Sequence, residues 1–190
     1  MTAPISTSIP GYVTGTWDID PAHTRLGFAA RHAMVATVRG GFEVFSGTIV
    51  IDHKNPSASS AEVEIDAASI STGNEQRDQH LRGADFLDVE SFPKIVFRST
   101  GAEEIDSETY KLVGELTIRD KSHPVTLELD FQGSSPDPFG NTRAGFEGKT
   151  TINRKDWGLT WNVAIEGGGI LVGEKVKLEL DVSAIKRPTE

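Results

Sequence analysis

Residues 110–118 read YKLVGELTI, and an apolar or small side chain occupies every second position of this stretch. Successive side chains of a β-strand point to opposite faces of a sheet, so the alternation predicts a strand with one apolar and one polar face. The same alternation returns in AEVEIDA at 61–67, VTLELDF at 125–131 and VKLELDV at 176–182. Strands with one apolar and one wet face are typical of an antiparallel sheet.

Further stretches with a more mixed pattern bring the expected number of strands to about eight. They are TRLGFAA at 24–30, GFEVFSGTIVID at 41–52, KIVFRST at 94–100 and AGFEGKTTI at 144–152. In a chain of 190 residues, this pattern predicts a single all-β domain, either an up-and-down barrel or a sandwich. An eight-stranded barrel either fills with its own side chains or holds one small ligand. Small residues on the inner faces are compatible with both: Ala30, Ala61, Ala67, Gly114, Ala144 and Gly148.

The composition excludes several classes of function. The chain has no cysteine, which removes disulfides, thiol catalysis and cysteine-ligated metal clusters. Its formal net charge is −9 and its basic residues are scattered, so we expect no nucleic-acid partner. Residues 1–15 lack the basic and apolar regions of a secretory signal, and no stretch reaches the about 20 apolar residues of a membrane-spanning helix. We therefore expect a cytoplasmic protein without an integral membrane segment.

Residues that could carry metal or nucleophilic chemistry are dispersed along the chain. A zinc site needs three or four converging ligands. The five histidines show no such clustering in the sequence: His23, His32, His53, His80 and His123. The G-x-S-x-G motif of a nucleophilic serine is also missing from the sequence. We expect no metal and no other cofactor.

One polar segment interrupts the strands, at residues 75–93 (EQRDQHLRGADFLDVESFP). Asn74 is a suitable N-cap and Gly83 a suitable terminator, which predicts a helix of about two turns. Asp78 and Arg82 lie four apart with the acid first, the favourable order for a helical ion pair. Three apolar side chains would hold the helix across the end of a barrel: Leu81, Phe86 and Phe92. The polar segment is therefore predicted to be a lid.

Four motifs follow one another in an order that resembles a known family. They are TWDIDPAHTRLGFAARH (16–32), SISTGNEQRDQHLRGADFLDVESFPKIVFRST (69–100), LVGELTIRDKSHPVTLEL (112–129) and INRKDWGL (152–159). Together they resemble the YceI-like family, bacterial polyisoprenoid-binding proteins with a lipocalin-like fold. The resemblance implies an extended antiparallel barrel around an apolar tunnel that binds long isoprenoid or other amphiphilic chains. It also implies frequent export of family members, whereas this chain shows no leader, and it implies no established enzymatic activity.

From the pattern and the resemblance together we expect a lipocalin-like barrel at residues 15–186, between a flexible N-terminal tail at 1–14 and a C-terminal tail at 187–190. A short helix or lid should cover one end. The residues expected to line the tunnel are Phe28, Ile65, Phe97, Leu112, Leu116, Leu129, Phe146 and Leu178. Those expected at the rim or lid are His32, Arg77, His80, Leu81, Phe86 and Trp157.

The expected function is to carry or store a polyisoprenoid, a prenyl quinone-like molecule or a fatty amphiphile. Two other functions stay open at this point. The chain could be an enzyme for a small hydrophobic substrate, with Asp78 and His80 as an acid–base pair. It could also be a filled barrel that binds another protein. A homodimer is possible in any of these cases.

Overall fold

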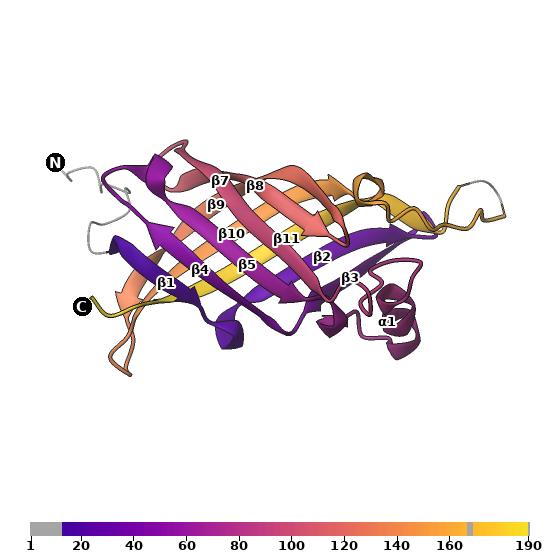
Figure 1. Ribbon diagram of the computed structural model, residues 1–190, viewed down its shortest axis with the longest axis horizontal. Coiled ribbons are helices and arrows are strands. Elements are labelled where there is room, and N and C mark those ends of the chain that lie inside the picture. The colour runs from indigo at the N-terminus through magenta and orange to yellow at the C-terminus, as the bar shows by residue number, and fades with distance from the viewer. Residues whose placement is uncertain (1–12, 167–168, 190) are drawn as a thin grey trace.

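The computed structural model describes residues 13–166 and 169–189. In these residues the chain is mostly β, with eight antiparallel strands closed into a barrel and one short α-helix beside one of its ends (Figure 1). The barrel strands, in the order in which they neighbour one another, are β1 (Gly15–Ile19), β4 (Phe45–Ile51), β5 (Ser60–Asp66), β7 (Lys94–Glu104), β8 (Thr109–Ile118), β9 (Lys121–Pro136), β10 (Thr142–Asn153) and β11 (Val172–Lys186). The predicted antiparallel barrel of about eight strands is confirmed.

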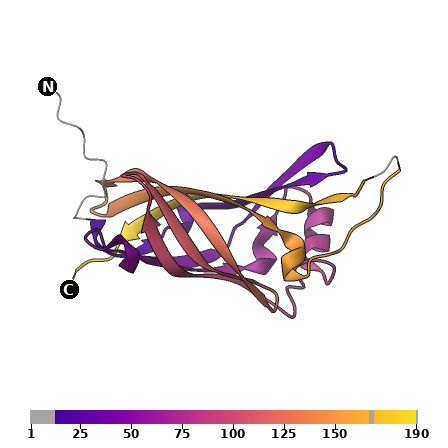
Figure 2. The same ribbon diagram turned by 90° about the horizontal axis from the view of Figure 1, so that it is seen from above.

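The barrel closes where β1 pairs with β11. At this place one edge of β11 pairs with two different strands, one after the other. One edge of β11 carries β10 along its length, whereas the other carries two strands in succession. Residues 184–186 pair with β1, and residues 172–181 pair with β2 (Arg25–His32). We call this division the fork. Beyond it, β2, β3 (Ala36–Phe42) and β6 (Ile70–Ser71) extend the wall past one end of the barrel (Figure 2).

Short helices connect the strands and mark the two ends of the molecule. The α-helix is α1 (Glu75–Arg82), and the 3-10 turns are η2 (Pro21–His23), η3 (Pro56–Ala58), η4 (Ala67–Ser69) and η5 (Arg154–Trp157). The end beside α1 is here called the lid end, and the end where β1 begins and β11 finishes is the mouth end (Figure 1). Among the helices of the described residues, none is long and apolar enough to cross a membrane.

Trp17 packs the mouth end from within. Its side chain is fully buried, and its Nε1 donates a hydrogen bond to the Val13 carbonyl oxygen at 2.7 Å. Thr14 Oγ1 accepts a bond from the His53 backbone N–H. Residues 13 and 14 therefore belong to the barrel rather than to the flexible tail predicted for 1–14. The remaining tail residues, 1–12, and residue 190 lie outside the described part of the chain.

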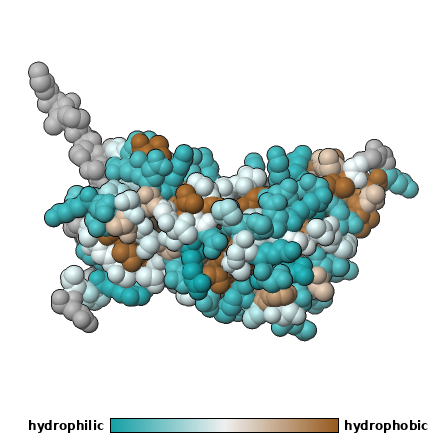
Figure 3. Space-filling model, turned by 45° about the horizontal axis from the view of Figure 1, so that its top comes forward, coloured by the Kyte–Doolittle hydropathy of each residue, from teal (hydrophilic) through white to brown (hydrophobic). Residues whose placement is uncertain are grey.

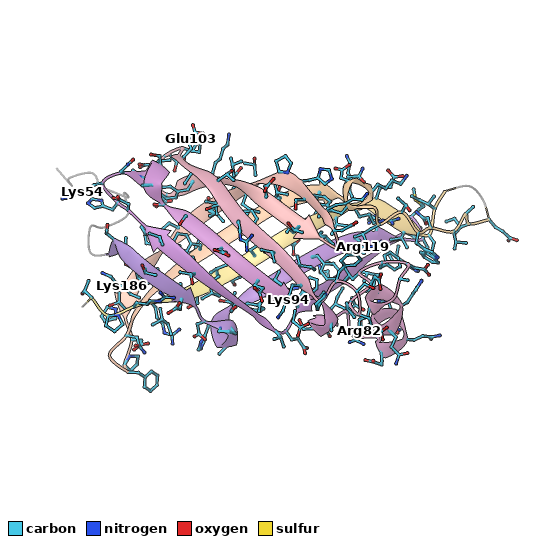
Figure 4. The ribbon with its side chains drawn as sticks, in the orientation of Figure 1. Lys54, Arg82, Lys94, Glu103, Arg119 and Lys186 are labelled. Carbon is cyan, nitrogen blue, oxygen red and sulfur yellow. The ribbon has the colours of Figure 1, made fainter. Side chains whose placement is uncertain are left out.

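The outer faces of the strands are polar, as the alternation predicts. Charged side chains project outward along the barrel (Figure 4), and hydrophilic residues cover most of the face seen in Figure 3. Ion pairs join neighbouring strands on this side, with Glu62 Oε1 3.0 Å from Arg98 Nε and Glu64 Oε1 3.4 Å from Lys94 Nζ. Such exposed pairs add little stability, so the backbone pairing between strands and the apolar inner faces hold the wall together.

Candidate ligand-binding tunnel

The inner faces of the strands enclose two cavities. The lid chamber, of about 240 Å³, lies toward α1, and the mouth chamber, of about 140 Å³, lies toward the opposite end. All eight residues predicted to line a tunnel face one or both of them. Phe28, Ile65, Leu116 and Leu178 line the lid chamber, Leu112, Leu129 and Phe146 line the mouth chamber, and Phe97 lines both.

Five residues line both chambers and so mark the place where the chambers meet. They are Leu26, Val63, Phe97, Leu127 and Leu180, from β2, β5, β7, β9 and β11. We call this ring the neck. Because the same residues belong to both walls, the two chambers adjoin one another inside the barrel.

The barrel interior is hollow rather than filled. Leu129, Leu178 and Leu180 point inward from the middle of long strands, yet each keeps part of its side chain accessible. In a close-packed protein interior such positions are buried against their neighbours. The filled barrel considered from the sequence is therefore not the fold of this chain.

The small inner residues have two different uses. A Cβ on Gly114 would lie 2.6 Å from the Phe97 ring, and one on Gly148 would lie 2.7 Å from Leu129. These glycines therefore make room for larger wall residues, not for a ligand. Ala30 and Ala61 do face the chambers, and there the small side chain widens the tunnel.

The two chambers differ in the chemistry of their walls. At the mouth end, the lining reaches polar and charged residues at the ends of β7 and β8 and in the loop after β4: Asp52, His53, Glu104, Tyr110 and Lys111. We call this polar border the mouth. The lid chamber has one polar wall residue among the described residues, Arg154, and its other lining residues are glycine or apolar. A tunnel with one wet end and one dry end suits an elongated ligand.

The lid is anchored by a network around Thr72. Asp78 is buried, and its Oδ1 accepts hydrogen bonds from Thr72 N at 2.9 Å and Thr72 Oγ1 at 2.5 Å. Arg77 donates from Nε to Thr72 Oγ1 at 2.7 Å and from Nη2 to the Thr72 carbonyl at 2.8 Å. Asn74 caps α1 as predicted, since its Oδ1 accepts from Arg77 N at 3.0 Å. The network fastens the start of α1 to the end of β6.

The predicted ion pair between Asp78 and Arg82 is wrong. Asp78 turns toward Thr72, and Arg82 instead donates to Glu75 Oε1 at 3.2 Å and to the carbonyls of Ala68 and Ile70. Helical spacing allowed the pair, but Asp78 binds Thr72 outside the helix, and Arg82 binds Glu75 and two backbone carbonyls.

The six predicted rim residues divide into two groups. Leu81 and Phe86 line the lid chamber. The lining of both chambers leaves out Arg77, which holds Thr72, and His32, which lies in the sheet between Ala36 and Val172.

The other two rim residues also lie outside the chamber linings. His80 Nε2 lies 2.9 Å from Asp85 Oδ2, and its ring packs edge-on against Trp161. Trp157 is buried, with Nε1 donating to the Leu116 carbonyl at 2.9 Å. Asp78 is hydrogen-bonded to Thr72, and His80 is hydrogen-bonded to Asp85. Asp78 and His80 therefore do not form the acid–base pair considered for an enzyme.

Arg154 is the site residue that sequence reasoning missed. It is buried at the start of η5, and its guanidinium donates to the carbonyls of Leu159, Trp161, Val172 and Gly173. Burial lowers its pKa, and the nearby Glu174 carboxylate partly opposes that shift. A signal for it exists, because the alternation that places Phe146 and Ile152 on the inner face of β10 continues to position 154.

Within the described residues, no group of three or more His, Asp or Glu side chains could hold a metal ion. The expectation that the protein carries no metal stays a prediction.

Comparisons with known proteins agree with this architecture. A family model described as the YceI-like domain matches residues 17–184. The chain is 38% identical over 143 residues to Protein YceI of Salmonella newport (strain SL254), a match that covers 75% of this chain and 74% of that protein. The crystal structure of the Campylobacter jejuni YCEI protein is 28% identical, with a TM-score of 0.71 over 83% of this chain and 90% of that one.

A more distant structure shares the fold. It is a domain from Saccharophagus degradans described as a polyisoprenoid binding domain implicated in plant cell wall breakdown. Its TM-score is 0.68 and its sequence identity is 14%, over 90% of this chain and 98% of that domain.

Proposed function

The chain belongs to the YceI-like domain family, and from this premise we propose that its tunnel binds one long apolar chain and carries or stores it. The ligand class is a polyisoprenoid, a prenyl quinone-like molecule or a fatty amphiphile. The observation that carries the proposal is the lid chamber, whose described wall has a single polar residue and which adjoins the mouth chamber at the neck. The description of the Saccharophagus domain as polyisoprenoid-binding supports the same ligand class.

The energetics suit such a ligand. An apolar tail that buries about 400 Å² gains roughly 10 kcal/mol at 25 cal/mol per Å². Association and ordering cost about 4–15 kcal/mol, so the net affinity depends on how little the tunnel must reorganise. The chambers are built from strands that pair continuously around the barrel, which keeps that cost low. Binding by burial alone also requires no catalytic group.

The neck provides the test of the proposal. We expect the affinity of the wild-type protein for a series of prenyl or alkyl chains to rise with length until the whole tunnel is filled. Leu180→Trp should block the neck, so that affinity stops rising at the length of one chamber while short chains bind as before. The outward neighbour Glu179→Gln is the control and should keep the full length dependence.

Two results of this experiment would oppose the proposal. Failure of the wild-type protein to bind any chain of the series would remove the function itself. An unchanged length dependence in Leu180→Trp would show that the chains bind elsewhere. Melting temperatures, measured in parallel, should stay close to wild type because Leu180 is partly accessible and borders both chambers.

A further inference from the structure

We propose that the lid end of the protein docks on an anionic phospholipid bilayer. The docking surface consists of three exposed apolar side chains, Met34, Val35 and Val163, and of the cations behind them. We call these three side chains the tip. The inference goes beyond the proposed function and does not depend on it, because the tip lies outside the lining of both chambers.

The tip is built where two segments meet past the end of the barrel. Figure 2 shows the β2–β3 hairpin and the chain before β11 projecting at the lid end. Ala33 N donates to the Leu171 carbonyl at 2.7 Å, and Leu171 N donates to the Val163 carbonyl at 2.9 Å. Met34 is 54% exposed, Val35 82% and Val163 46%, and hydrophobic residues gather at this end in Figure 3. The two segments therefore present one apolar surface.

Hydrogen bonds hold the tip in its exposed position. Val35 N donates to the His32 carbonyl at 3.2 Å and closes the hairpin turn. On the other segment, Asn162 Oδ1 accepts from Val163 N and from Val172 N, each at 3.0 Å, and its Nδ2 donates to the Val172 carbonyl at 2.8 Å. The apolar side chains are thus held outward and are not folded back onto the protein.

The hairpin that carries the tip is positively charged. Residues 24–42 contain three arginines and no aspartate or glutamate, although the whole chain has a net charge of −9. Arg31 lies at the turn itself, where its Nη2 donates to the Met34 carbonyl at 3.4 Å. Among the described residues beside the tip there is one acid, Glu166, on the other segment. The hairpin therefore has the charge that complements an anionic surface.

Two further cations lie behind Arg31 on the outer face of the wall. Arg39 and Lys177 are both register partners of Ala29, whose neighbour Ala30 lines the lid chamber, so alternation directs them outward. In the part of the chain that the structure describes, no carboxylate forms an ion pair with any of these three cations. Salt screens charges beyond about 8 Å, so the acids elsewhere on the protein do not cancel this local attraction.

This combination suits a bilayer better than a protein partner. Apolar side chains can enter the boundary between head groups and acyl chains while the cations behind them meet lipid phosphates. A stable protein interface buries about 800 Å² on each partner, which three side chains on a projecting tip do not offer.

Vesicle cosedimentation of the protein without a ligand tests the apolar part of the surface. The wild-type protein should bind phosphatidylcholine vesicles with about 30% phosphatidylglycerol about tenfold tighter than pure phosphatidylcholine vesicles. The double variant Met34→Asn, Val35→Thr should bind the anionic vesicles about tenfold more weakly, because it keeps the backbone preferences of the turn but removes apolar area. Phe139→Ser is the matched control: Phe139 is 85% exposed in the β9–β10 turn at the mouth end, and its loss should not alter binding.

The charge is tested by a second pair of variants. Arg31→Gln should weaken binding to the anionic vesicles about fivefold. Lys54→Gln removes the same charge at the opposite end of the molecule (Figure 4) and should bind as wild type. Val35→Trp should bind more tightly than wild type, because tryptophan favours the membrane–water interface, and such a gain cannot arise from misfolding.

The outcomes separate this inference from the proposed function. Leu180→Trp should dock as wild type although its neck is blocked. Absence of wild-type binding to the anionic vesicles would overturn the inference and leave the tunnel function intact, because chain binding is measured without vesicles. Equal losses in the tip variant and in Phe139→Ser would show adsorption without a preferred face and also overturn it. Self-association that depends on the tip, without vesicle binding, would assign the tip to a second copy of the chain and overturn it as well.

Discussion

Gly114 in β8 and Gly101 in β7 lie in neighbouring strands of the same sheet, but they differ in the atoms that an added Cβ would contact. A Cβ at Gly114 would lie 2.5 Å from the Arg98 carbonyl oxygen and 2.6 Å from the Phe97 ring, whereas one at Gly101 meets nothing within 4 Å. We expect Gly114→Ala to lower the free energy of unfolding by about 1–3 kcal/mol, because a backbone oxygen cannot move aside. Gly101→Ala, the control, should be close to neutral. Urea denaturation measures both, and equal effects would contradict this explanation.

Asp20 links η2 to the barrel through charge. Arg143 Nη1 and His23 Nδ1 each lie 2.7 Å from Asp20 Oδ2, and these bonds, with that of Arg143 the stronger, lower the pKa of Asp20 to about 2. The unfolded carboxyl titrates near pH 3.9. Because the folded pKa is depressed, the contribution to stability is present above about pH 4 and disappears as pH falls through about 2.

Asp20→Asn keeps a capping side chain for η2 but removes the charge, so it isolates this contribution. We expect a loss of about 1 kcal/mol at neutral pH, a value reduced by solvent around the pair. The difference from wild type should shrink as pH is lowered from about 4 to about 2. Denaturation curves over this range measure it, with Asp120→Asn in the exposed β8–β9 turn as control. A difference that stays constant with pH would refute the ionic origin.

At the level of single residues, the sequence predicts side-chain direction better than side-chain partners. Leu116 and Leu178 face the lid chamber, because strand alternation depends only on local backbone geometry. Asp78 and His80 found partners at Thr72 and Asp85 that helical spacing does not indicate. Arg154 was missed because a charged residue breaks the apolar pattern, although its position continues it.

At the level of elements, α1 is held to the barrel mainly at its first turns. Thr72 Oγ1 both donates to Asp78 and accepts from Arg77, so one hydroxyl joins the helix to β6. Thr72→Val removes this hydroxyl with little change in shape. We expect the amide hydrogens of α1 to exchange faster in Thr72→Val than in wild type, while those of the barrel strands keep their rates. A bound chain should also dissociate faster from the variant. The affinity should change less, because the hydroxyl does not line the chambers.

The control for this lid variant is Glu75→Gln. Glu75 is exposed and pairs only with Arg82 at 3.2 Å, so its loss should leave α1 exchange near the wild-type rate. Hydrogen exchange followed by mass spectrometry compares the two variants directly. Equal protection of α1 in Thr72→Val and wild type would mean that the apolar contacts of Leu81 and Phe86 hold the lid by themselves.

The elements themselves were largely predictable, whereas their connection at the fork was not. Alternating stretches located the long barrel strands, and Asn74 located the start of α1. The fork depends on where β11 changes its partner from β1 to β2, and both partners offer the same alternation. A local pattern cannot distinguish two such partners, so the extension of the wall past the barrel required the structure.

At the scale of the whole molecule, the two adjoining chambers should set the stoichiometry of binding. A chain long enough to pass the neck should occupy both chambers and bind once per protein. A short ligand such as octanoate should fit either chamber, so two copies per protein become possible at high concentration. Native mass spectrometry counts them. A second long chain bound under the same conditions would contradict a single continuous tunnel.

The closing pair of strands joins the two extremes of the chain, since Trp17 faces Lys186. During synthesis β11 is the last of the barrel strands to leave the ribosome, so the nascent chain spends a time on the order of seconds with an incomplete ring. Throughout that interval the leucines and phenylalanines of the inner wall face water, and two strand edges stay open to pairing with other chains. An mRNA truncated before the codons of β11 would therefore yield a sheet that aggregates and must be bound by chaperones, even if the other seven strands of the barrel had formed correctly.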